Sequence, residues 1–155
     1  KAFGYRILEP LIQLRKDGVR MVGKALGLPA ALFARIPFPG PALSARVIGA
    51  VTPERIATVR SATAIVERLL SDSGAFQYLA VLLNDRATGI RDGRREFGQI
   101  IVVRCLDSTD ARTATSVDLP WEKLHRICER VTAIAGVNRC LYDMTPKPPA
   151  TIEYV

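Results

Sequence analysis

The sequence is poor in the side chains that most enzymes use for metal binding or nucleophilic catalysis. It contains one histidine, His125, and three widely separated cysteines, Cys105, Cys128 and Cys140. No pair of these has the spacing of metal ligands, so we expect no metal ion to bind. The odd number of cysteines favours reduced thiols in a cytoplasmic protein over disulfides. His125 falls within a helical pattern, and we expect it to be structural.

Long hydrophobic runs and glycine-rich loops are also missing. The longest apolar run, Tyr78–Leu83, is far shorter than the stretch of about 18 residues that can span a bilayer. The first residues, Lys1–Leu8, contain no Met and no signal peptide, so we expect a chain that is processed, truncated or only the ordered part of something longer. Neither a Walker loop nor a Ser-Gly-Gly phosphate loop occurs, and no Cys–His pair suits glutamine hydrolysis. We therefore expect no membrane span and no catalytic residues in this chain alone.

What the sequence does have is positive charge and a large apolar fraction. The 155 residues include 22 Lys and Arg against 15 Asp and Glu, a net charge of +7, and 48% are hydrophobic. The apolar fraction is sufficient for one compact core. The charge favours an anionic ligand, which could be a nucleic acid, a phosphorylated metabolite or an acidic partner. Because aromatic residues do not alternate with basic ones, an RNA-binding domain is the less favoured reading and nucleic acid an unlikely partner.

Local signals divide the chain into a short first segment and a larger domain. Helices are predicted over residues 16–26 and 30–34, the first ended by a glycine. Three prolines within residues 37–41 exclude both a helix interior and a central strand. We therefore predict a first segment of residues 1–34 and a domain of residues 35–155.

The larger domain is predicted to alternate strands and helices. Thr52 and Pro53 form a typical helix start, because Thr52 can accept a hydrogen bond from a free amide and Pro53 suits the first helical position. The order favours an α+β fold, with a small mainly antiparallel sheet and two principal helices on one face. Two nearly apolar strands also favour a homodimer. The predicted elements are strand 43–49, helix 53–70, strand 76–83, a polar connection 84–98, strand 99–106, helix 120–135, and strands 139–144 and 151–154.

Several stretches, in this order, resemble the end of glutamine-hydrolysing GMP synthase. The most distinctive are two long, proline-containing pieces of unusual composition, Arg35-Ile-Pro-Phe-Pro-Gly-Pro41 and Lys147-Pro-Pro-Ala-Thr-Ile-Glu153. The resemblance implies that residues 1–34 close an ATP-pyrophosphatase domain and that residues 35–155 form the dimerisation domain. The other matching pieces are Leu8–Leu11, Leu14–Arg20, Leu26–Pro29, Leu43, Arg46–Gly49, Val51–Arg55, Gln77, Ala80–Leu83, Gly136–Arg139 and Tyr142-Asp143.

The resemblance implies a part in the ATP-dependent amination of xanthosine monophosphate (XMP) to GMP. In that family, an amidotransferase domain makes ammonia from glutamine, and the pyrophosphatase domain adenylates XMP. Because both catalytic motifs are missing here, the resemblance implies a dimerising, XMP-binding part that is not catalytic alone. The implied partners are a second copy, XMP and those two domains. No cofactor is expected on this chain alone, whereas ATP and magnesium are implied for the full enzyme.

The family's contacts to XMP match Gln77, Arg139, Lys147, Ile152 and Glu153. Lys147 and Arg139 offer charge-assisted donors for the phosphate, and the prolines around Lys147 leave its loop little entropy to lose on binding. Glu153 can accept bonds from ribose or base, Gln77 can donate or accept, and Ile152 offers an apolar wall. Each residue also has an ordinary structural reading, as a surface charge or as part of a strand.

Some positions depart from the family's pattern. Ile36 replaces a histidine, Ala42 replaces a glycine, and residues 91–95 replace a turn that begins with glycine. These departures leave open a divergent standalone dimerisation or interaction module that has lost synthase function. Arg35 and Arg46 flank the proline loop, where they either face the pocket or, as we favour, brace the junction.

Overall fold

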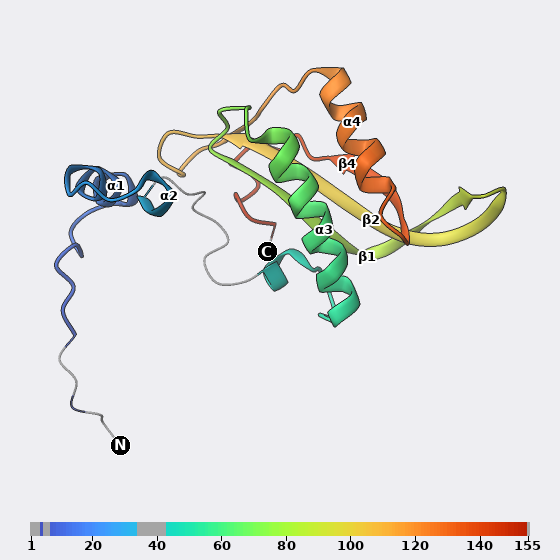
Figure 1. Ribbon diagram of the computed structural model, residues 1–155, viewed down its shortest axis with the longest axis horizontal. Helices are drawn as coiled ribbons and strands as arrows, with labels where there is room; N and C mark the ends of the chain where they lie inside the picture. Colours follow the sequence, from blue (N-terminus) through green and yellow to red (C-terminus); the bar gives the residue numbers. More distant parts are fainter. Residues whose placement is uncertain (1–3, 5–6, 34–42, 155) are drawn as a thin grey trace. The chain divides into compact units, whose positions relative to one another are not determined.

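The computed structural model describes residues 4, 7–33 and 43–154, and the chain falls into two compact units (Figure 1). The units are Lys1–Ile36 and Pro37–Val155. Their assignment to two domains of a GMP synthase stays a prediction. The proline loop, with Arg35, Ile36 and Ala42, lies outside the described residues.

The first unit contains two helices, α1 (Lys16–Ala25) and α2 (Ala30–Phe33). In α1, Asp17 lies in the first turn and Lys24 in the last, so each charge sits at the end of the helix dipole that it stabilises. The helix is followed by Gly27 at φ +72°, a conformation that favours glycine. Both helices were predicted from the sequence, with boundaries that differ by one residue.

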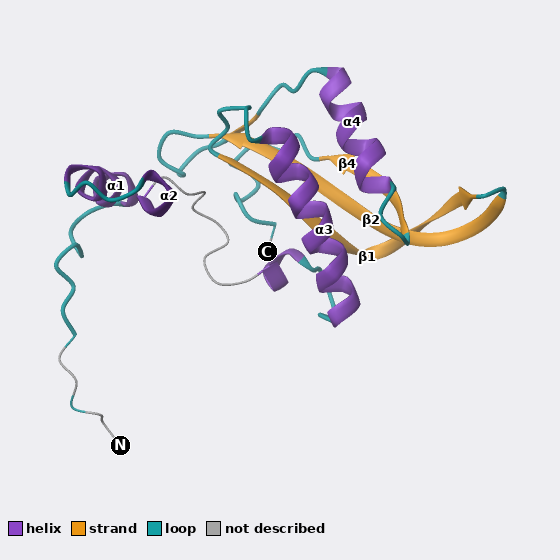
Figure 2. Cartoon of the chain, in the orientation of Figure 1, coloured by secondary structure: helices purple, strands orange, loops and turns teal. Residues whose placement is uncertain are grey.

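The second unit contains a four-stranded mixed sheet with β2 at its centre (Figure 2). The strands β1 (Gln77–Arg91) and β2 (Arg94–Asp107) pair antiparallel over most of their length. On its other side, β2 pairs antiparallel with β3 (Thr115–Ser116) and parallel with β4 (Val137–Tyr142). The α+β class is confirmed, and two of the three strand pairings are antiparallel as predicted.

Two helices, α3 (Pro53–Leu70) and α4 (Trp121–Thr132), pack against the sheet. The predicted start of α3 is confirmed, since Thr52 Oγ1 accepts a hydrogen bond from the Arg55 amide at 3.4 Å. Both helices contribute to a single core cluster with alternate residues of the central strands, so they cover the same face. The fully or almost fully buried members of this cluster include Val59, Ala62, Val66, Leu70, Ala80, Leu82, Ile101, Val103, Cys105, Ile127 and Val131.

The β1–β2 hairpin is longer than predicted. Residues 84–98 were read as a polar connection, but most of them continue the two strands to a tight turn at Asp92 and Gly93. Both turn residues have positive φ, 51° and 73°, as hairpin turns require. This part of the hairpin lies beyond the helices and is largely exposed on both faces. It therefore lacks the apolar alternation by which strands are recognised.

Two other strand predictions were wrong. The predicted strand 43–49 is a 3-10 helix, η1 (Leu43–Arg46), followed by a single bridge between Val47 and Leu82. The predicted last strand, 151–154, is irregular, and the carbonyls of Thr151 and Ile152 bond to a side chain instead of a neighbouring strand. Within the described ranges, no helix is both long enough and apolar enough to cross a membrane.

Candidate functional site

The candidate site is formed around the last part of the chain, residues 143–153, here called the tail segment. It carries three of the five predicted ligand-binding residues: Lys147, Ile152 and Glu153. The tail segment lies against the face of the sheet that the helices leave open. Val103 and Cys105 point into the helix-covered core, so Arg104 between them points to the opposite face, where it meets the tail segment.

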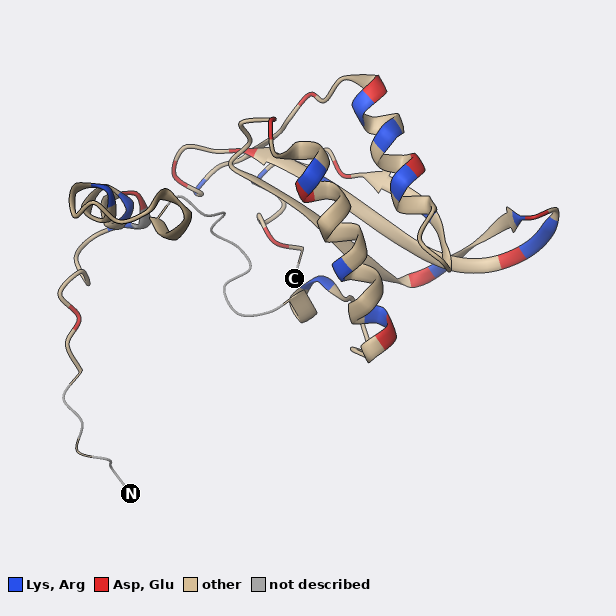
Figure 3. Cartoon of the chain, in the orientation of Figure 1, with Lys and Arg blue, Asp and Glu red and all other residues tan. Residues whose placement is uncertain are grey.

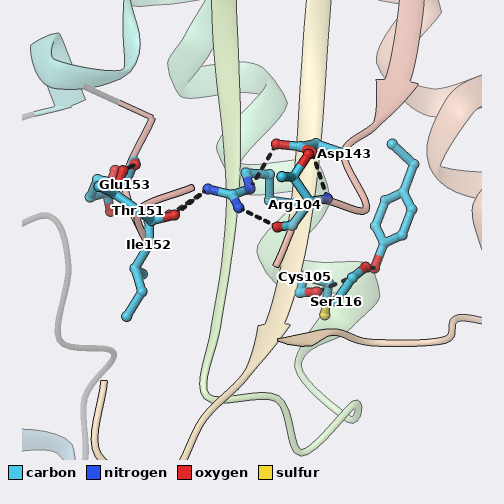
Figure 4. Close-up of polar contacts among 9 residues, drawn as sticks. Arg104, Cys105, Ser116, Asp143, Thr151, Ile152 and Glu153 are labelled. Atoms are coloured by element: carbon cyan, nitrogen blue, oxygen red, sulfur yellow. Dashed lines mark hydrogen bonds and ion pairs between the residues drawn. The ribbon is translucent and has the colours of Figure 1, made fainter. Parts of the chain in front are cut away.

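Arg104 is the central contact of this site (Figure 4). Its side chain is 1% exposed, and Nε lies 2.9 Å from Asp143 Oδ2 in an ion pair. Nη1 donates to the carbonyls of Thr151 and Ile152 at 2.7 and 3.0 Å, and Nη2 donates to that of Thr145 at 2.9 Å. A buried guanidinium needs a partner for its charge and acceptors for its donors. Asp143 balances the charge and the tail-segment carbonyls accept from Nη1 and Nη2, whereas Nε meets Asp143 as an ion pair without a hydrogen bond.

Glu153 is held by residues from two other parts of the unit. Arg46, from η1, donates through Nε and Nη2 to the two carboxylate oxygens of Glu153, at 3.2 and 3.0 Å. Gln77, the first residue of β1, donates through Nε2 to Oε1 of Glu153 at 3.4 Å. The structure therefore brings Glu153 together with the fully buried Gln77, and Arg46 bonds to the same carboxylate.

Lys147 is fixed through both its backbone and its side chain. Its amide donates to the Ala114 carbonyl at 2.8 Å, and its own carbonyl accepts from the Ala114 amide at 3.0 Å. The ammonium donates to the carbonyl of Ala111 at 2.8 Å. An ammonium has three donors, so this contact leaves Lys147 able to bind a further acceptor.

The other two predicted residues occupy different environments. Ile152 is 4% exposed and packs with Leu106 and Ala114 in a small core cluster, although it does not lie in a strand. Arg139 is exposed on β4, opposite Ile100 of β2, and its Nη1 donates to the carbonyl of its own neighbour, Asn138. Arg139 thus lies apart from Gln77, which pairs with Leu106 at the other end of β2.

Comparison with known proteins decides the family. The family described as "GMP synthase C terminal domain" matches residues 65–154, which is more than half of the chain. This chain belongs to that GMP synthase family. It is 53% identical over 150 residues to a subunit of glutamine-hydrolyzing GMP synthase from Methanocella arvoryzae, and 49% and 47% identical over 152 residues to the proteins of the same name from Pyrococcus furiosus and Thermococcus kodakarensis.

These alignments cover 96% of this chain but only 49%, 49% and 50% of the three relatives. The chain therefore spans about half the length of the GMP synthase subunits that it matches. The resemblance carried by the proline loop and by residues 147–153 is confirmed. The region matched to the GMP synthase C-terminal domain contains β1 to β4, α4 and the tail segment, whereas Arg46 lies before it.

Arg104 is the residue of this GMP synthase domain that sequence reasoning missed. A signal was present, because Arg104 is the only charged residue within the otherwise nearly apolar stretch 99–106. A charge at the centre of a buried strand requires a specific partner. Its contacts to Thr145, Thr151 and Ile152 nevertheless span 41 to 48 residues along the chain. No local pattern could predict them.

The polar groups around the site are suited to binding rather than to nucleophilic attack. Burial raises the pKa of the neighbouring Cys105 thiol to about 11, so it stays protonated at neutral pH. Burial likewise raises the pKa of Tyr142, whose hydroxyl donates to the Val117 carbonyl at 2.7 Å. In the part of the chain that the structure describes, no group of three or more His, Cys, Asp or Glu residues could hold a metal ion.

Proposed function

We propose that this chain is the C-terminal part of a cytoplasmic GMP synthase, where it binds XMP and forms a homodimer. It would act in the ATP-dependent amination of XMP to GMP without being catalytic alone. ATP, magnesium, the pyrophosphatase domain and the glutamine amidotransferase would be needed for turnover. The observation that carries the proposal is that, in a chain of this family, Gln77 bonds to Glu153 on the same tail segment that carries the anchored Lys147.

The geometry of Lys147 and Glu153 supports nucleotide binding. Lys147 is held in place but keeps donors for a phosphate oxygen, and a charge-assisted bond of this kind is stronger than a neutral one. The Glu153 carboxylate accepts from Arg46 and Gln77, and its two oxygens together have about four acceptor positions, so a ribose hydroxyl can also donate to it. A site that is formed before the ligand arrives loses less conformational entropy on binding.

Apolar side chains outside the helix-covered core support the homodimer. Leu141 on β4 is 47% exposed, and Ile90 and Phe97 on the hairpin extension are 80% and 60% exposed. A two-stranded ribbon is only marginally stable without a covering layer. A second copy, related by a two-fold axis, would cover these side chains and support the ribbon.

The nucleotide-binding role predicts a specific loss for Lys147→Ala. Calorimetric titration of the full-length protein with XMP should show about 10- to 100-fold weaker binding, because a hydrogen bond to a charged group contributes about 1.5–3 kcal/mol. Lys123→Ala on α4 is the matched control, since the Lys123 ammonium pairs with the exposed Asp72 at 2.7 Å and should leave XMP affinity unchanged. Equal affinity of Lys147→Ala and the wild type would contradict the phosphate role.

The alternative is a dimerisation or interaction module that has lost nucleotide binding. Two of the sequence departures that favour this alternative, Ile36 and Ala42, lie outside the described residues. The altered loop at residues 91–95 forms a regular hairpin turn, in which Arg91 pairs with Glu96 at 3.0 Å. A full-length protein that dimerises but takes up no XMP would support this alternative. Basic side chains are spread over α3, α4 and the hairpin (Figure 3), and we propose no nucleic-acid ligand.

A further inference from the structure

We propose that Arg104 is a positioning residue for nucleotide binding: it fixes the path of the tail segment and thereby places Lys147 and Glu153. This inference rests on the proposed function, because it assigns XMP as the ligand that the tail segment binds. Arg104 is itself 1% exposed and all four of its described contacts go to the tail segment, so its effect on the ligand is indirect.

The contacts of Arg104 lie on both sides of the loop that carries Lys147. Asp143 and Thr145 precede residues 146–150, and Thr151 and Ile152 follow them. One guanidinium therefore ties the beginning of this loop to its end (Figure 4). Because Arg104 lies in β2, which pairs with the other three strands, the loop is tied to the centre of the sheet.

The tail segment depends on such side-chain contacts because it is not a strand. Its backbone contacts are few: the Asp143 amide donates to the Val103 carbonyl at 2.9 Å, Lys147 forms an isolated bridge with Ala114, and the Ala150 amide donates to the Pro146 carbonyl at 3.0 Å. The carbonyls of Thr145, Thr151 and Ile152 instead accept from Arg104. Removal of the guanidinium would leave these carbonyls to find water or to move, and the loop would loosen.

The chemistry of arginine is needed here, and positive charge alone is not sufficient. A guanidinium is a planar fork whose separate nitrogens can reach several acceptors at once, whereas a lysine ammonium is a single point. Lysine at position 104 can keep the charge opposite Asp143 but cannot bond to both ends of the loop. Asparagine at position 143 removes the ion pair but leaves the three carbonyl contacts intact. The two variants therefore separate the effect of the guanidinium's several hydrogen bonds from the effect of its ion pair with Asp143.

The experiment compares Arg104→Lys, Asp143→Asn and the exposed control Arg126→Lys in the full-length protein. XMP affinity is measured by calorimetry at a temperature at which thermal melts show every variant folded. We expect the dissociation constant to rise about tenfold for Arg104→Lys and about threefold for Asp143→Asn, and to stay unchanged for Arg126→Lys. In the assembled enzyme, the KM for XMP should rise while the KM for ATP does not, which a general loss of folded protein would not produce.

Hydrogen exchange supplies the second readout. In Arg104→Lys, the amides of Lys147 and Ala150 should exchange faster than in the wild type, while those of α3 should not. Unchanged XMP affinity, or weaker affinity with unchanged exchange in the tail segment, would overturn the inference. If Arg104→Lys does not fold, the inference is tested with Asp143→Asn instead, by its XMP affinity and by hydrogen exchange in its tail segment. If the wild type binds no XMP, the proposed function fails and the inference falls with it, whereas faster exchange would then show only a structural role.

Discussion

At the scale of single residues, burial separates two kinds of arginine in the second unit. Arg46 and Arg104 are buried and bond to the tail segment, whereas Arg68 and Arg126 lie exposed on α3 and α4. The sequence could predict Arg46 as a candidate, because it lies in a stretch that resembles a known family. It did not predict Arg104, because the groups that neutralise it come from a segment about 40 residues away.

Buried thiols lead to a residue-scale prediction about pH. Burial raises the pKa of Cys140 to about 12 and that of Cys105 to about 11, whereas an unfolded chain releases these protons near pH 9. Between about pH 9 and 11, the unfolded state therefore binds fewer protons than the folded state. The free energy of unfolding should fall as the pH rises through this window, and should not depend on these groups below about pH 8.

Urea unfolding at pH 7.5 and pH 10 tests this prediction. The tyrosines Tyr78 and Tyr142 also have raised pKa values and contribute to the same pH dependence. The informative quantity is therefore the free energy of unfolding of the wild type minus that of Cys140→Ala. That difference should shrink at pH 10, since the variant lacks one group that resists ionisation. An equal difference at both pH values would show that Cys140 does not titrate as the buried site requires.

At the scale of elements, the helices and the inner parts of the strands were predictable, but the hairpin extension, η1 and β3 were not. The start of α3 combines a threonine cap with a proline, and α4 has a clear apolar face, so local signals were sufficient. The extension of β1 and β2 is exposed on both faces and was read as a loop. The strand β3 has only two residues, which is too short to show a pattern.

The extension is joined to β4 by close packing around Asn138. Its Nδ2 donates to the Ala87 carbonyl at 3.2 Å, and its side chain lies against Gly89 and Gly98. A Cβ at position 98 would lie 2.4 Å from Asn138 Cγ, far inside contact distance. Gly98→Ala should therefore destabilise the second unit by about 1–3 kcal/mol in chemical unfolding.

A double variant controls for other effects of the added methyl group. Gly98→Ala combined with Asn138→Ala removes the clash, although it also loses the bond to the Ala87 carbonyl. We expect the double variant to be less destabilised than the sum of the two single variants. Strict additivity would show that the strain at Gly98 does not come from Asn138.

At the scale of the whole molecule, the chain is about half the length of the relatives that it resembles, and its second unit leaves apolar side chains exposed. The predicted homodimer can be tested directly. Light scattering should give twice the 17.0 kDa of one chain, and Leu141→Glu or Phe97→Glu should shift the mass toward the monomer, because a buried charge at an interface is costly.

Trp121→Glu is the matched control for the dimer, since Trp121 is exposed on α4 and is not among the apolar side chains that the second copy is proposed to cover. It should leave the mass unchanged. A monomeric wild type would contradict the dimer proposal, and a dimer that only Trp121→Glu disrupts would move the interface to the helices.

Local chemistry in the sequence determined the helices, the inner strands, the α+β class and the family resemblance. These depend on caps, prolines, apolar spacing and short motifs, all of which act over a few residues. Only the tertiary structure decided the path of the tail segment, the burial of Ile152, the separate position of Arg139 and the contacts of Arg104. The physical reason is that the tail segment is held by side chains, over 100 residues away at Arg46 and over 40 at Arg104. Such contacts leave no periodic trace in the sequence.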